Sequence, residues 1–234
     1  MKRISVIIPA YNEENSLPRA LSALSRQDFP RDDFEIIVVD NNSTDATTDI
    51  ARRWGADVVI FEHRAGTNQA RKTGLAHASG EIVAFLDADC VPPREWVSRI
   101  NEFFAAAPEG VAAVAGPYNF DTEHYAVYLV QDMYWRILFP SLSFVVGRVL
   151  NRGGAMLGGN FAAPKKSFDE ANPIDPSYAF FGDDAAIARN FGKVGWVQFD
   201  NSLGVNSSSR RFKRDGFWKT QWRYAKSYVQ VMMK

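Results

Sequence analysis

The stretch Glu81-Ile-Val-Ala-Phe-Leu-Asp87-Ala-Asp89 decides the fold. Its apolar run, residues 82–86, has the length and the β-branched start of a buried strand in a parallel sheet. Ligands of open α/β sheets bind beyond the carboxyl ends of such strands, which is where Asp87 and Asp89 fall. Two carboxylates at this spacing suit a hard cation such as Mg²⁺ or Mn²⁺, although Asp89 could instead cap the helix expected after Pro92-Pro93.

The rest of the chain alternates strands with helices. The predicted strands are residues 4–8, 34–39, 58–61, 82–86, 111–115 and 196–199, and residues 157–164 are expected to lead into a further short strand. The predicted helices are about residues 16–27, 46–54, 66–74, 95–107 and 183–192. This alternation predicts an α/β fold with three layers, α/β/α, and a mainly parallel central sheet.

The first strand is expected to stop at Pro9, which has no N–H for a sheet hydrogen bond. The turn that follows, Pro9-Ala-Tyr-Asn-Glu13, lacks the Gly-x-Gly-x-x-Gly pattern of a dinucleotide-binding unit. No Walker-type phosphate loop is present either. The sequence therefore predicts an α/β domain that is neither a Rossmann dehydrogenase nor a P-loop protein.

Composition limits the class of protein further. The 27 basic and 27 acidic residues balance, so no global charge indicates a nucleic-acid partner. Apolar residues make up 46% of the 234 residues, enough for the core of a single domain. Cys90 is the single cysteine, which excludes an intramolecular disulfide and fits a reducing compartment. The N-terminus is strand-like rather than a signal peptide, and no apolar run reaches the ~20 residues of a membrane helix, so a cytoplasmic location is expected.

Other polar residues stand where strands end or helices begin. Asp40 follows the second strand, where an acidic side chain often holds a ribose or a base, whereas Ser43 and Asp45 are interpreted as turn and cap residues. Arg71 and its neighbour Lys72 could reach phosphates or lie on a solvated helix face.

The paired glycines 158–159 indicate close approach of a backbone or a ligand. Asp183 and Asp184 open the last predicted helix. Carboxylates there cap a helix and complement its dipole, which stabilises it by up to about 1 kcal/mol. A helix N-terminus also holds a carboxylate ionised, as a general base requires, so the two interpretations are compatible.

Two segments are candidates for contact with a membrane. Residues 125–150 are apolar and aromatic, and they are predicted to form one or two amphipathic helices beside the site. Residues 207–234 are basic and aromatic. This tail could be an ordinary surface helix, a phosphate-binding flank or an interfacial helix on an anionic membrane.

Six motifs occur in one order: Ser-Val-Ile-Ile-Pro-Ala-Tyr-Asn-Glu, Val-Val-Asp-Asn-Asn-Ser-Thr-Asp, Gly-Thr-Asn-Gln-Ala-Arg, Phe-Leu-Asp-Ala-Asp, Gly-Gly-Asn-Phe and Phe-Gly-Asp-Asp-Ala. Together they resemble family 2 glycosyltransferases, the inverting nucleotide-sugar transferases of the A-type fold, over about residues 3–200. The resemblance implies one domain with a nucleotide-binding half at 1–116, an acceptor-binding half at 117–206 and the tail at 207–234.

The resemblance also implies a role for each matching residue. Asp184 would be the catalytic base, beside Asp183, which stands where the family more often has glutamate. Asp89, with Asp87, would hold Mn²⁺ or Mg²⁺. The implied nucleotide-sugar contacts are Pro9, Tyr11 and Glu13 around the nucleoside, Asp40 at the base or ribose, Arg71 near the diphosphate, Asp87, Ala88 and Asp89 at the nucleotide, sugar and metal, and Gly159 and Asn160 near the donor sugar and acceptor. Asn68 is a further implied contact.

Two differences from relatives in this family limit the expected type of enzyme and the expected metal ligands. The Gln-x-x-Arg-Trp motif of processive polysaccharide synthases is not found, which favours an enzyme that adds one sugar. The late histidine that completes the metal site in some relatives is missing, because His63, His77 and His124 all come early. The metal would then be held mainly by Asp89, the diphosphate and water.

The implied function is transfer of a hexosyl group from a UDP-sugar, or next a GDP-sugar, to a hydroxyl of a sugar or lipid-linked acceptor. A lipid-linked acceptor would suit peripheral contact with the inner face of a membrane. One alternative is an inactive nucleotide-sugar-binding or assembly protein, whose mark would be a missing base or metal carboxylate. Another is a nucleotidyltransferase, which would carry a glycine-rich loop after the first strand and release pyrophosphate.

Overall fold

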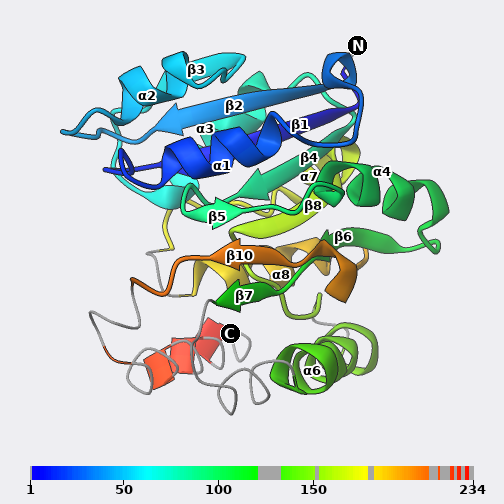
Figure 1. The fold of residues 1–234 in the computed structure, drawn as a ribbon. Helices are drawn as coiled ribbons and strands as arrows, with labels where there is room; N and C mark the ends of the chain where they lie inside the picture. The colour runs from blue at the N-terminus through cyan, green and yellow to red at the C-terminus, as the bar shows by residue number, and fades with distance from the viewer. Residues whose placement is uncertain are drawn as a thin grey trace.

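The structure is a computed structural model that describes residues 2–120, 133–150, 153–178 and 182–210, with residues 216, 222–223, 226–227 and 230–231. The main sheet in these residues is built from β1 Ile4–Ala10, β2 Phe34–Asp40, β3 Val58–Phe61, β4 Ile82–Leu86, β6 Val111–Ala115, β8 Asn160–Pro164 and β9 Trp196–Phe199. The strand order is β3-β2-β1-β4-β8-β6-β9, which puts β4 at the centre (Figure 1).

Parallel pairing dominates this sheet. β1 runs parallel to β2 and β4, β2 to β3, and β6 to β9, while β8 is antiparallel to both β4 and β6. The predicted α/β fold with a mainly parallel sheet is therefore confirmed. Because β8 runs the opposite way, its first residues, not its last, lie beside the carboxyl end of β4, where Leu86 pairs with Asn160.

The prediction that Pro9 ends the first strand is wrong, because β1 continues to Ala10. Pairing of β1 with β4 stops at Ile7, whereas pairing with β2 continues to Ala10. Pro9 therefore lies where β1 has one neighbouring strand in place of two, a position at which a missing N–H is tolerated.

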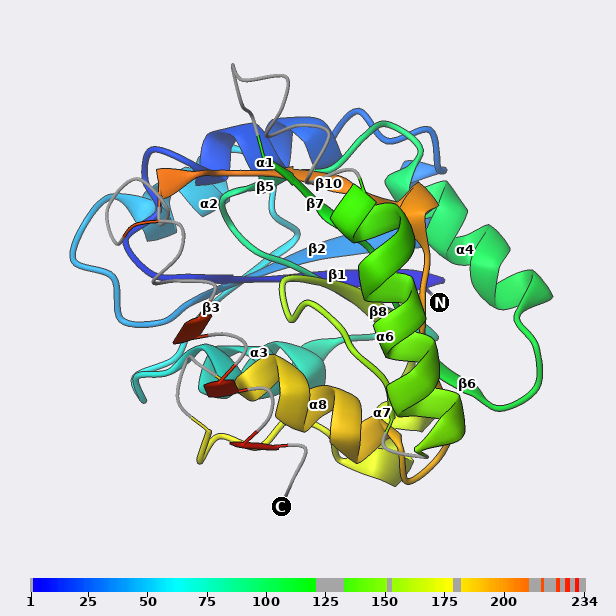
Figure 2. The same ribbon diagram turned by 90° about the horizontal axis from the view of Figure 1, so that it is seen from below.

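Helices cover both faces of the sheet, as Figure 2 shows with α1 and α2 on one side and α3 and α8 on the other. The helices are α1 Leu17–Leu24, α2 Thr47–Arg53, α3 Thr67–His77, α4 Trp96–Ala106, α7 Lys165–Ala171 and α8 Asp183–Phe191. Alternate side chains of β1 pack on opposite faces of the sheet. Val6 and Ile8 belong to the hydrophobic cluster that contains Leu21 of α1, and Ile7 belongs to the cluster that contains Ala70 of α3. This period of two is what a strand buried on both faces requires.

A small second sheet joins the end of β4 to a late part of the chain. It consists of β5 Cys90–Val91, β10 Val205–Ser207 and β7 Tyr118–Phe120, in that order. Ser207 pairs with Cys90, which directly follows Asp89. The residues after β10 are thereby brought next to Asp89.

Residues 134–149 form continuous helical turns: η2 Tyr134–Leu138, α6 Phe139–Phe144 and η3 Val145–Val149. They pack on the edge strand β9, where the rings of Phe139 and Phe199 are 4.7 Å apart and Arg148 lies 3.9 Å over the ring of Trp196. The helical prediction for 125–150 is confirmed for this part, and residues 125–132 lie outside the described residues. Within the described chain, every helix is too short or too polar to cross a bilayer.

Candidate active site

A buried arginine connects the acidic groups at the carboxyl edge of the sheet. Arg71 of α3 is 3% exposed, and its guanidinium lies 2.8 Å from Asp183 Oδ2 and 3.7 Å from Asp87 Oδ1. Asn68, one turn earlier, accepts a hydrogen bond of 3.1 Å from Arg71 and donates one of 3.0 Å to the carbonyl of Asp175. One guanidinium thus ties α3 to the end of β4 and the start of α8. Its Nε has no hydrogen-bond partner among the described residues.

The paired glycines let the backbone before β8 touch two of these carboxylates. A Cβ on Gly158 would lie 2.1 Å from Asp184 Oδ1, and one on Gly159 would lie 1.9 Å from Asp87 Oδ2. The amide of Gly158 donates to Asp184, and the amide of Asp87 donates to the carbonyl of Gly159 at 3.0 Å. Any side chain at these two positions would displace the carboxylates, which explains the glycines.

Asp184 is the carboxyl with the most altered proton affinity. Burial raises its pKa to about 8, and the charge of Asp183 adds to the increase, while Arg71 and the amide of Gly158 oppose it. Burial also raises the pKa of Asp183, but the ion pair with Arg71 favours its ionised form. The expectation that the helix N-terminus holds the carboxylate ionised is therefore wrong for Asp184, because burial outweighs the helix dipole and the carboxyl keeps its proton at neutral pH for most of the time. A group that gains and loses a proton near neutral pH suits general acid–base chemistry.

Tyr118 of β7 holds Asp87 from the other side. Its hydroxyl donates a hydrogen bond of 3.2 Å to Asp87 Oδ2. Burial, and next the charge of Asp87, raise the pKa of Tyr118 far above its usual value, so the phenol keeps its proton and stays a donor. The sequence analysis missed this residue. Its signal is a tyrosine two residues after Gly116, close behind the carboxyl end of β6.

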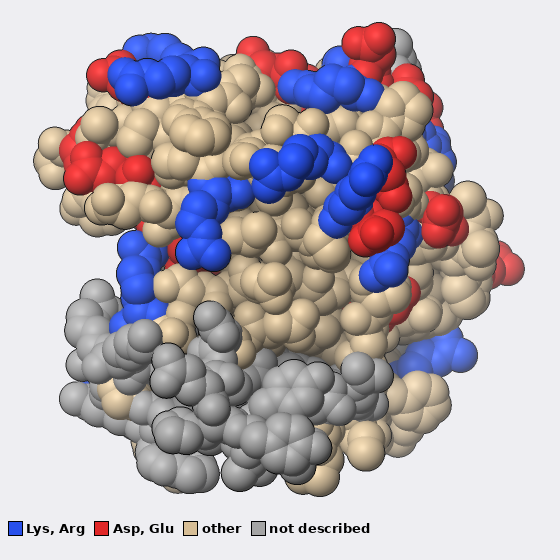
Figure 3. All heavy atoms as spheres, in the orientation of Figure 1, with Lys and Arg blue, Asp and Glu red and all other residues tan. Residues whose placement is uncertain are grey.

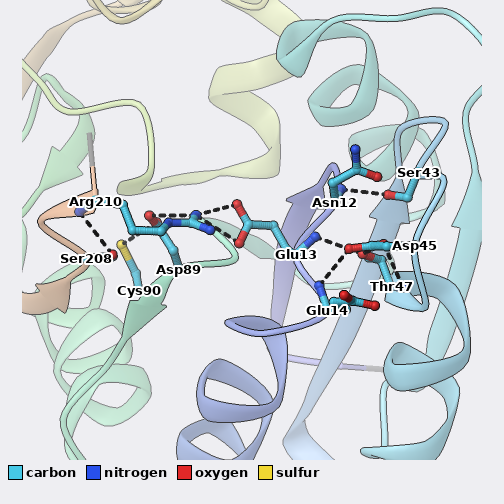
Figure 4. A network of polar contacts seen from close by, with 10 residues as sticks. All are labelled: Asn12, Glu13, Glu14, Ser43, Asp45, Thr47, Asp89, Cys90, Ser208 and Arg210. Carbon is cyan, nitrogen blue, oxygen red and sulfur yellow. Dashed lines mark hydrogen bonds and ion pairs between the residues drawn. The ribbon is translucent and has the colours of Figure 1, made fainter. Parts of the chain in front are cut away.

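A second acidic pair lies beside this group. Figure 4 shows the guanidinium of Arg210 between Glu13, in the loop after β1, and Asp89, in the turn after β4. Arg210 Nη2 is 2.7 Å and 2.9 Å from the two oxygens of Glu13 and 3.4 Å from Asp89 Oδ2. Burial raises the pKa of Asp89 to about 6, with smaller contributions from Asp87 and Glu13, and Arg210 counteracts them.

Asp89 has the features expected of a ligand for a divalent cation. Its side chain is 23% exposed, and a positive charge, the guanidinium of Arg210, already stands against it. In the described part of the chain, no three His, Cys, Asp or Glu side chains gather into a ready metal site. Mg²⁺ and related ions commonly use one or two carboxylates and take the remaining ligands from substrate phosphates and water. The residues present fit that arrangement.

Two of the residues predicted to contact the nucleotide sugar are buried and form hydrogen bonds within the protein. The carboxylate of Asp40 is 1% exposed and accepts hydrogen bonds from the amide of Ser43 and the hydroxyl of Thr48. Asn160 is also 1% exposed, and its amide is bonded to the indole of Trp96 and to backbone carbonyls of Pro117 and Leu203. The structure brings neither side chain into the group around Arg71.

The remaining predicted contacts lie around the same edge. Pro9 and Ala88 are buried, so their side chains shape the strand ends and not an open surface. Tyr11 is 60% exposed, which leaves its ring free for stacking. Glu13 lies with Asp89, while Asn68, Arg71, Asp87, Asp183 and Asp184 form one cluster with Gly159. Ligand contacts by these residues stay predictions.

Comparison with known proteins identifies the family. The profile described as glycosyl transferase family 2 matches residues 5–168, so the chain belongs to this family. The glycosyltransferase AglE of Haloferax volcanii is 41% identical over 101 residues, which cover 41% of this chain and 33% of AglE. The poly(ribitol-phosphate) β-N-acetylglucosaminyltransferase TarS of Staphylococcus aureus is 37% identical over 94 residues, 38% of this chain and 16% of TarS. The chain thus spans a third or less of these two relatives.

Solved structures share the fold. The mannosyltransferase PcManGT of Pyrobaculum calidifontis, in complex with GDP-Man and Mn²⁺, superposes with a TM-score of 0.71 at 24% identity over 98% of this chain and 62% of that one. TarS 1–349 of S. aureus with UDP-GlcNAc gives 0.68 at 19% identity, over 89% of this chain and 59% of that one. Glucosyl-3-phosphoglycerate synthase of Mycobacterium tuberculosis, with Mn²⁺ and UDP-Glc, superposes with a TM-score of 0.64 at 23% identity, over 99% of this chain and 80% of that one. The predicted A-type fold is confirmed.

The raised pKa of Asp184 has a consequence for stability. The unfolded chain loses this proton near pH 3.8 and the folded chain near pH 8, so the folded state is progressively destabilised between these values as the pH rises. We expect Asp184→Asn, which cannot ionise, to be more stable than the wild type by up to about 5 kcal/mol at pH 8 and by little at pH 4. Urea unfolding across this pH range measures the difference.

Asp169→Asn is the matched control, because Asp169 is an exposed carboxylate of α7. Its free energy of unfolding should stay within about 0.5 kcal/mol of the wild type. If the stability difference between Asp184→Asn and the wild type does not grow from pH 4 to pH 8, the assigned proton affinity is wrong.

Proposed function

We propose that this domain is an inverting glycosyltransferase that moves one sugar from a nucleotide-diphosphate donor to an acceptor hydroxyl. The single observation that carries the proposal is the position of Asp184: a carboxyl with a pKa near neutrality beside the buried Arg71–Asp183 pair. Membership of glycosyl transferase family 2 supports the reaction class. The proposal covers the donor-binding half at 1–116 and the acceptor-binding half at 117–206.

In the proposed reaction, the acceptor hydroxyl donates its proton to Asp184 as its oxygen attacks the anomeric carbon. The bond between that carbon and the diphosphate oxygen breaks on the opposite side, so the anomeric configuration inverts. A base works best when its pKa lies near the working pH, and the pKa of Asp184 at about 8 meets this condition.

Arg71 and Tyr118 are proposed to position Asp87 for the donor sugar. Asp87 receives a charged partner from Arg71 on one oxygen and a hydroxyl from Tyr118 on the other. Groups fixed in this way lose little freedom when a substrate binds, which favours a productive geometry. Asp183 is proposed to hold Arg71 in place and to keep the proton on its neighbour.

Asp89, assisted by Asp87, is proposed to hold Mn²⁺ or Mg²⁺. Bound there, the ion would neutralise charge that develops on the departing diphosphate. A UDP-sugar is the first candidate donor and a GDP-sugar the second. Both kinds occur with related folds, since PcManGT is described with GDP-Man and TarS with UDP-GlcNAc.

The first test is a thermal-shift panel of UDP, GDP, CDP and ADP, each with and without Mn²⁺. We expect one nucleotide to raise the melting temperature in a metal-dependent way, because a ligand that binds the native state stabilises it by about 2.7 kcal/mol at a hundredfold excess over Kd. In Asp89→Asn, the metal-dependent part of the shift should disappear. Glu109→Gln, at an exposed carboxylate before β6, is the control. No shift with any nucleotide would favour the inactive alternative.

The second test concerns the base. With the donor that the panel identifies, Asp184→Asn should lower nucleoside diphosphate release at least about 100-fold while the thermal shift by the nucleotide persists. The wild-type kcat/KM should rise with pH up to about pH 8, since Asp184 must lose its proton before it can accept another. Retained turnover in the variant would disprove the assignment. Release of pyrophosphate would instead support a nucleotidyltransferase.

We also propose peripheral contact with an anionic membrane, in keeping with a lipid-linked acceptor. The outward side of residues 137–150 is mostly apolar where a solvated helix would be polar, with Ser141 and Arg148 as its exposed polar residues. Seven side chains of this outer face are between 44% and 65% exposed: Ile137, Leu138, Leu142, Phe144, Val145, Val149 and Leu150. Elsewhere, on the face seen in Figure 3, acidic and basic side chains are interspersed. An exposed apolar helix face of this kind suits insertion at a bilayer interface.

Vesicle flotation at low salt tests this contact. The protein should float with vesicles that contain anionic lipid, and the double variant Phe144→Glu/Val149→Glu should bind about tenfold more weakly, because two apolar contacts become charged. Phe61→Glu is the matched control, since Phe61 is 45% exposed on β3, at the other end of the sheet. Failure of the wild type to bind any anionic vesicle would remove the membrane proposal and leave the glycosyltransferase proposal intact.

A further inference from the structure

Arg210 is held at the acidic pair by the small sheet. It follows β10 by three residues, and Ser207 at the end of β10 pairs with Cys90, the residue after Asp89. The amide of Arg210 donates a hydrogen bond of 3.3 Å to the hydroxyl of Ser208. The position of Arg210 is therefore tied to the same strand pair that fixes Asp89.

One nitrogen of Arg210 serves two carboxylates. Nη2 lies within 2.9 Å of both oxygens of Glu13 and 3.4 Å from Asp89 Oδ2 (Figure 4). Among the residues that the structure describes, Arg210 is the cationic side chain in contact with both groups. Two neighbouring carboxylates repel each other unless a cation lies between them, so Arg210 reduces the repulsion within the pair.

The exposure of Arg210 nevertheless favours its departure from the two carboxylates. Its side chain is 54% exposed, whereas that of Arg71 is 3% exposed and surrounded by partners. The partners of Arg210 are less exposed, Glu13 at 17% and Asp89 at 23%, but a guanidinium that is half in water keeps much of its hydration, so its contacts are weaker than those of a buried arginine. A divalent ion on Asp89 would face the guanidinium at short range with the same sign of charge, so the two cations exclude each other at this carboxylate.

We propose that Arg210 is an exchangeable cation: it occupies the Glu13–Asp89 pair when no donor is bound and moves to the donor diphosphate when a divalent cation takes Asp89. This rests on the proposed function, because the donor supplies the diphosphate. A guanidinium offers paired N–H groups that match phosphate oxygens, and the arriving diphosphate is the one strong anion that enters with the metal. Arg210 is therefore a competitor of the metal alone and a partner of the metal–nucleotide complex.

The proposal predicts opposite effects of one substitution. Arg210→Gln should bind Mn²⁺ alone about fivefold more tightly than the wild type, as measured from the electron paramagnetic resonance signal of free Mn²⁺. In saturating Mn²⁺, the same variant should bind the nucleoside diphosphate at least about fivefold more weakly, as measured by calorimetry. A residue with a merely structural role would weaken both or neither.

Two further variants serve as controls. Arg52→Gln removes an exposed arginine of α2 that lies 3.6 Å from Asp49, and it should change neither affinity. Arg210→Lys keeps the charge without the planar fork, so it should leave Mn²⁺ affinity near the wild-type value while weakening nucleotide binding. Thermal melting of each variant confirms that it is folded before titration.

The outcomes separate this inference from the proposed function. Unchanged or weaker Mn²⁺ binding by Arg210→Gln would overturn the exchange at Asp89, whatever the nucleotide result. Unchanged nucleotide affinity would overturn the contact with the diphosphate. If the wild type binds no nucleoside diphosphate, the proposed function and the diphosphate step fail together, while the Mn²⁺ titration still decides whether Arg210 competes for Asp89.

Discussion

The acidic edge of this sheet depends on the charge of Arg71. Buried carboxylates are stable only when a cation or several donors compensate them, and removal of one partner from a buried ion pair costs about 3–5 kcal/mol. Arg71 compensates Asp183 directly and Asp87 at 3.7 Å, yet a single charge cannot neutralise three carboxylates. The missing positive charge affects Asp184, which is buried beside Asp183 and whose pKa rises to about 8. Incomplete compensation thus gives Asp184 the proton affinity that the proposed general base requires.

Two arginines contact the carboxylates at this edge of the sheet, and they differ in how deeply they are buried. Arg71 comes from the middle of a helix in the core, so its guanidinium is fixed and tunes the proton affinity of its neighbours. Arg210 follows β10, is 54% exposed and contacts carboxylates that are only partly buried, Glu13 at 17% and Asp89 at 23% exposure. The first suits a constant electrostatic background and the second suits exchange. The turn of Asp87, Ala88 and Asp89 lies between them, so its two carboxylates experience different environments.

The sequence predicted the parts of the fold that local periodicity encodes. The bounds of β3, β4, β6 and β9 match the prediction, and the Asp-Ala-Asp turn lies at the central strand as expected. The pairing of Arg71 with Asp183 joins residues 112 positions apart, and that of Arg210 with Glu13 joins residues 197 apart. Such contacts follow from strand order, including the antiparallel β8, and no local pattern carries that information. Asp40 shows the same limit, because its burial depends on how the turn after β2 closes over it.

The identity of residue 210 constrains how a metal can be used. A histidine would offer a lone pair and complete a coordination sphere before substrate arrives, whereas a guanidinium has only donors and is always charged. An arginine against Asp89 therefore replaces a ligand with a competitor. On this proposal, Asp89 would hold a metal weakly without substrate, and the diphosphate would supply both the missing ligands and a new partner for Arg210. Under the proposed exchange, the cation would favour binding of the nucleotide and the nucleotide binding of the cation, because the cation displaces Arg210 from Asp89 and the diphosphate gives Arg210 a new partner.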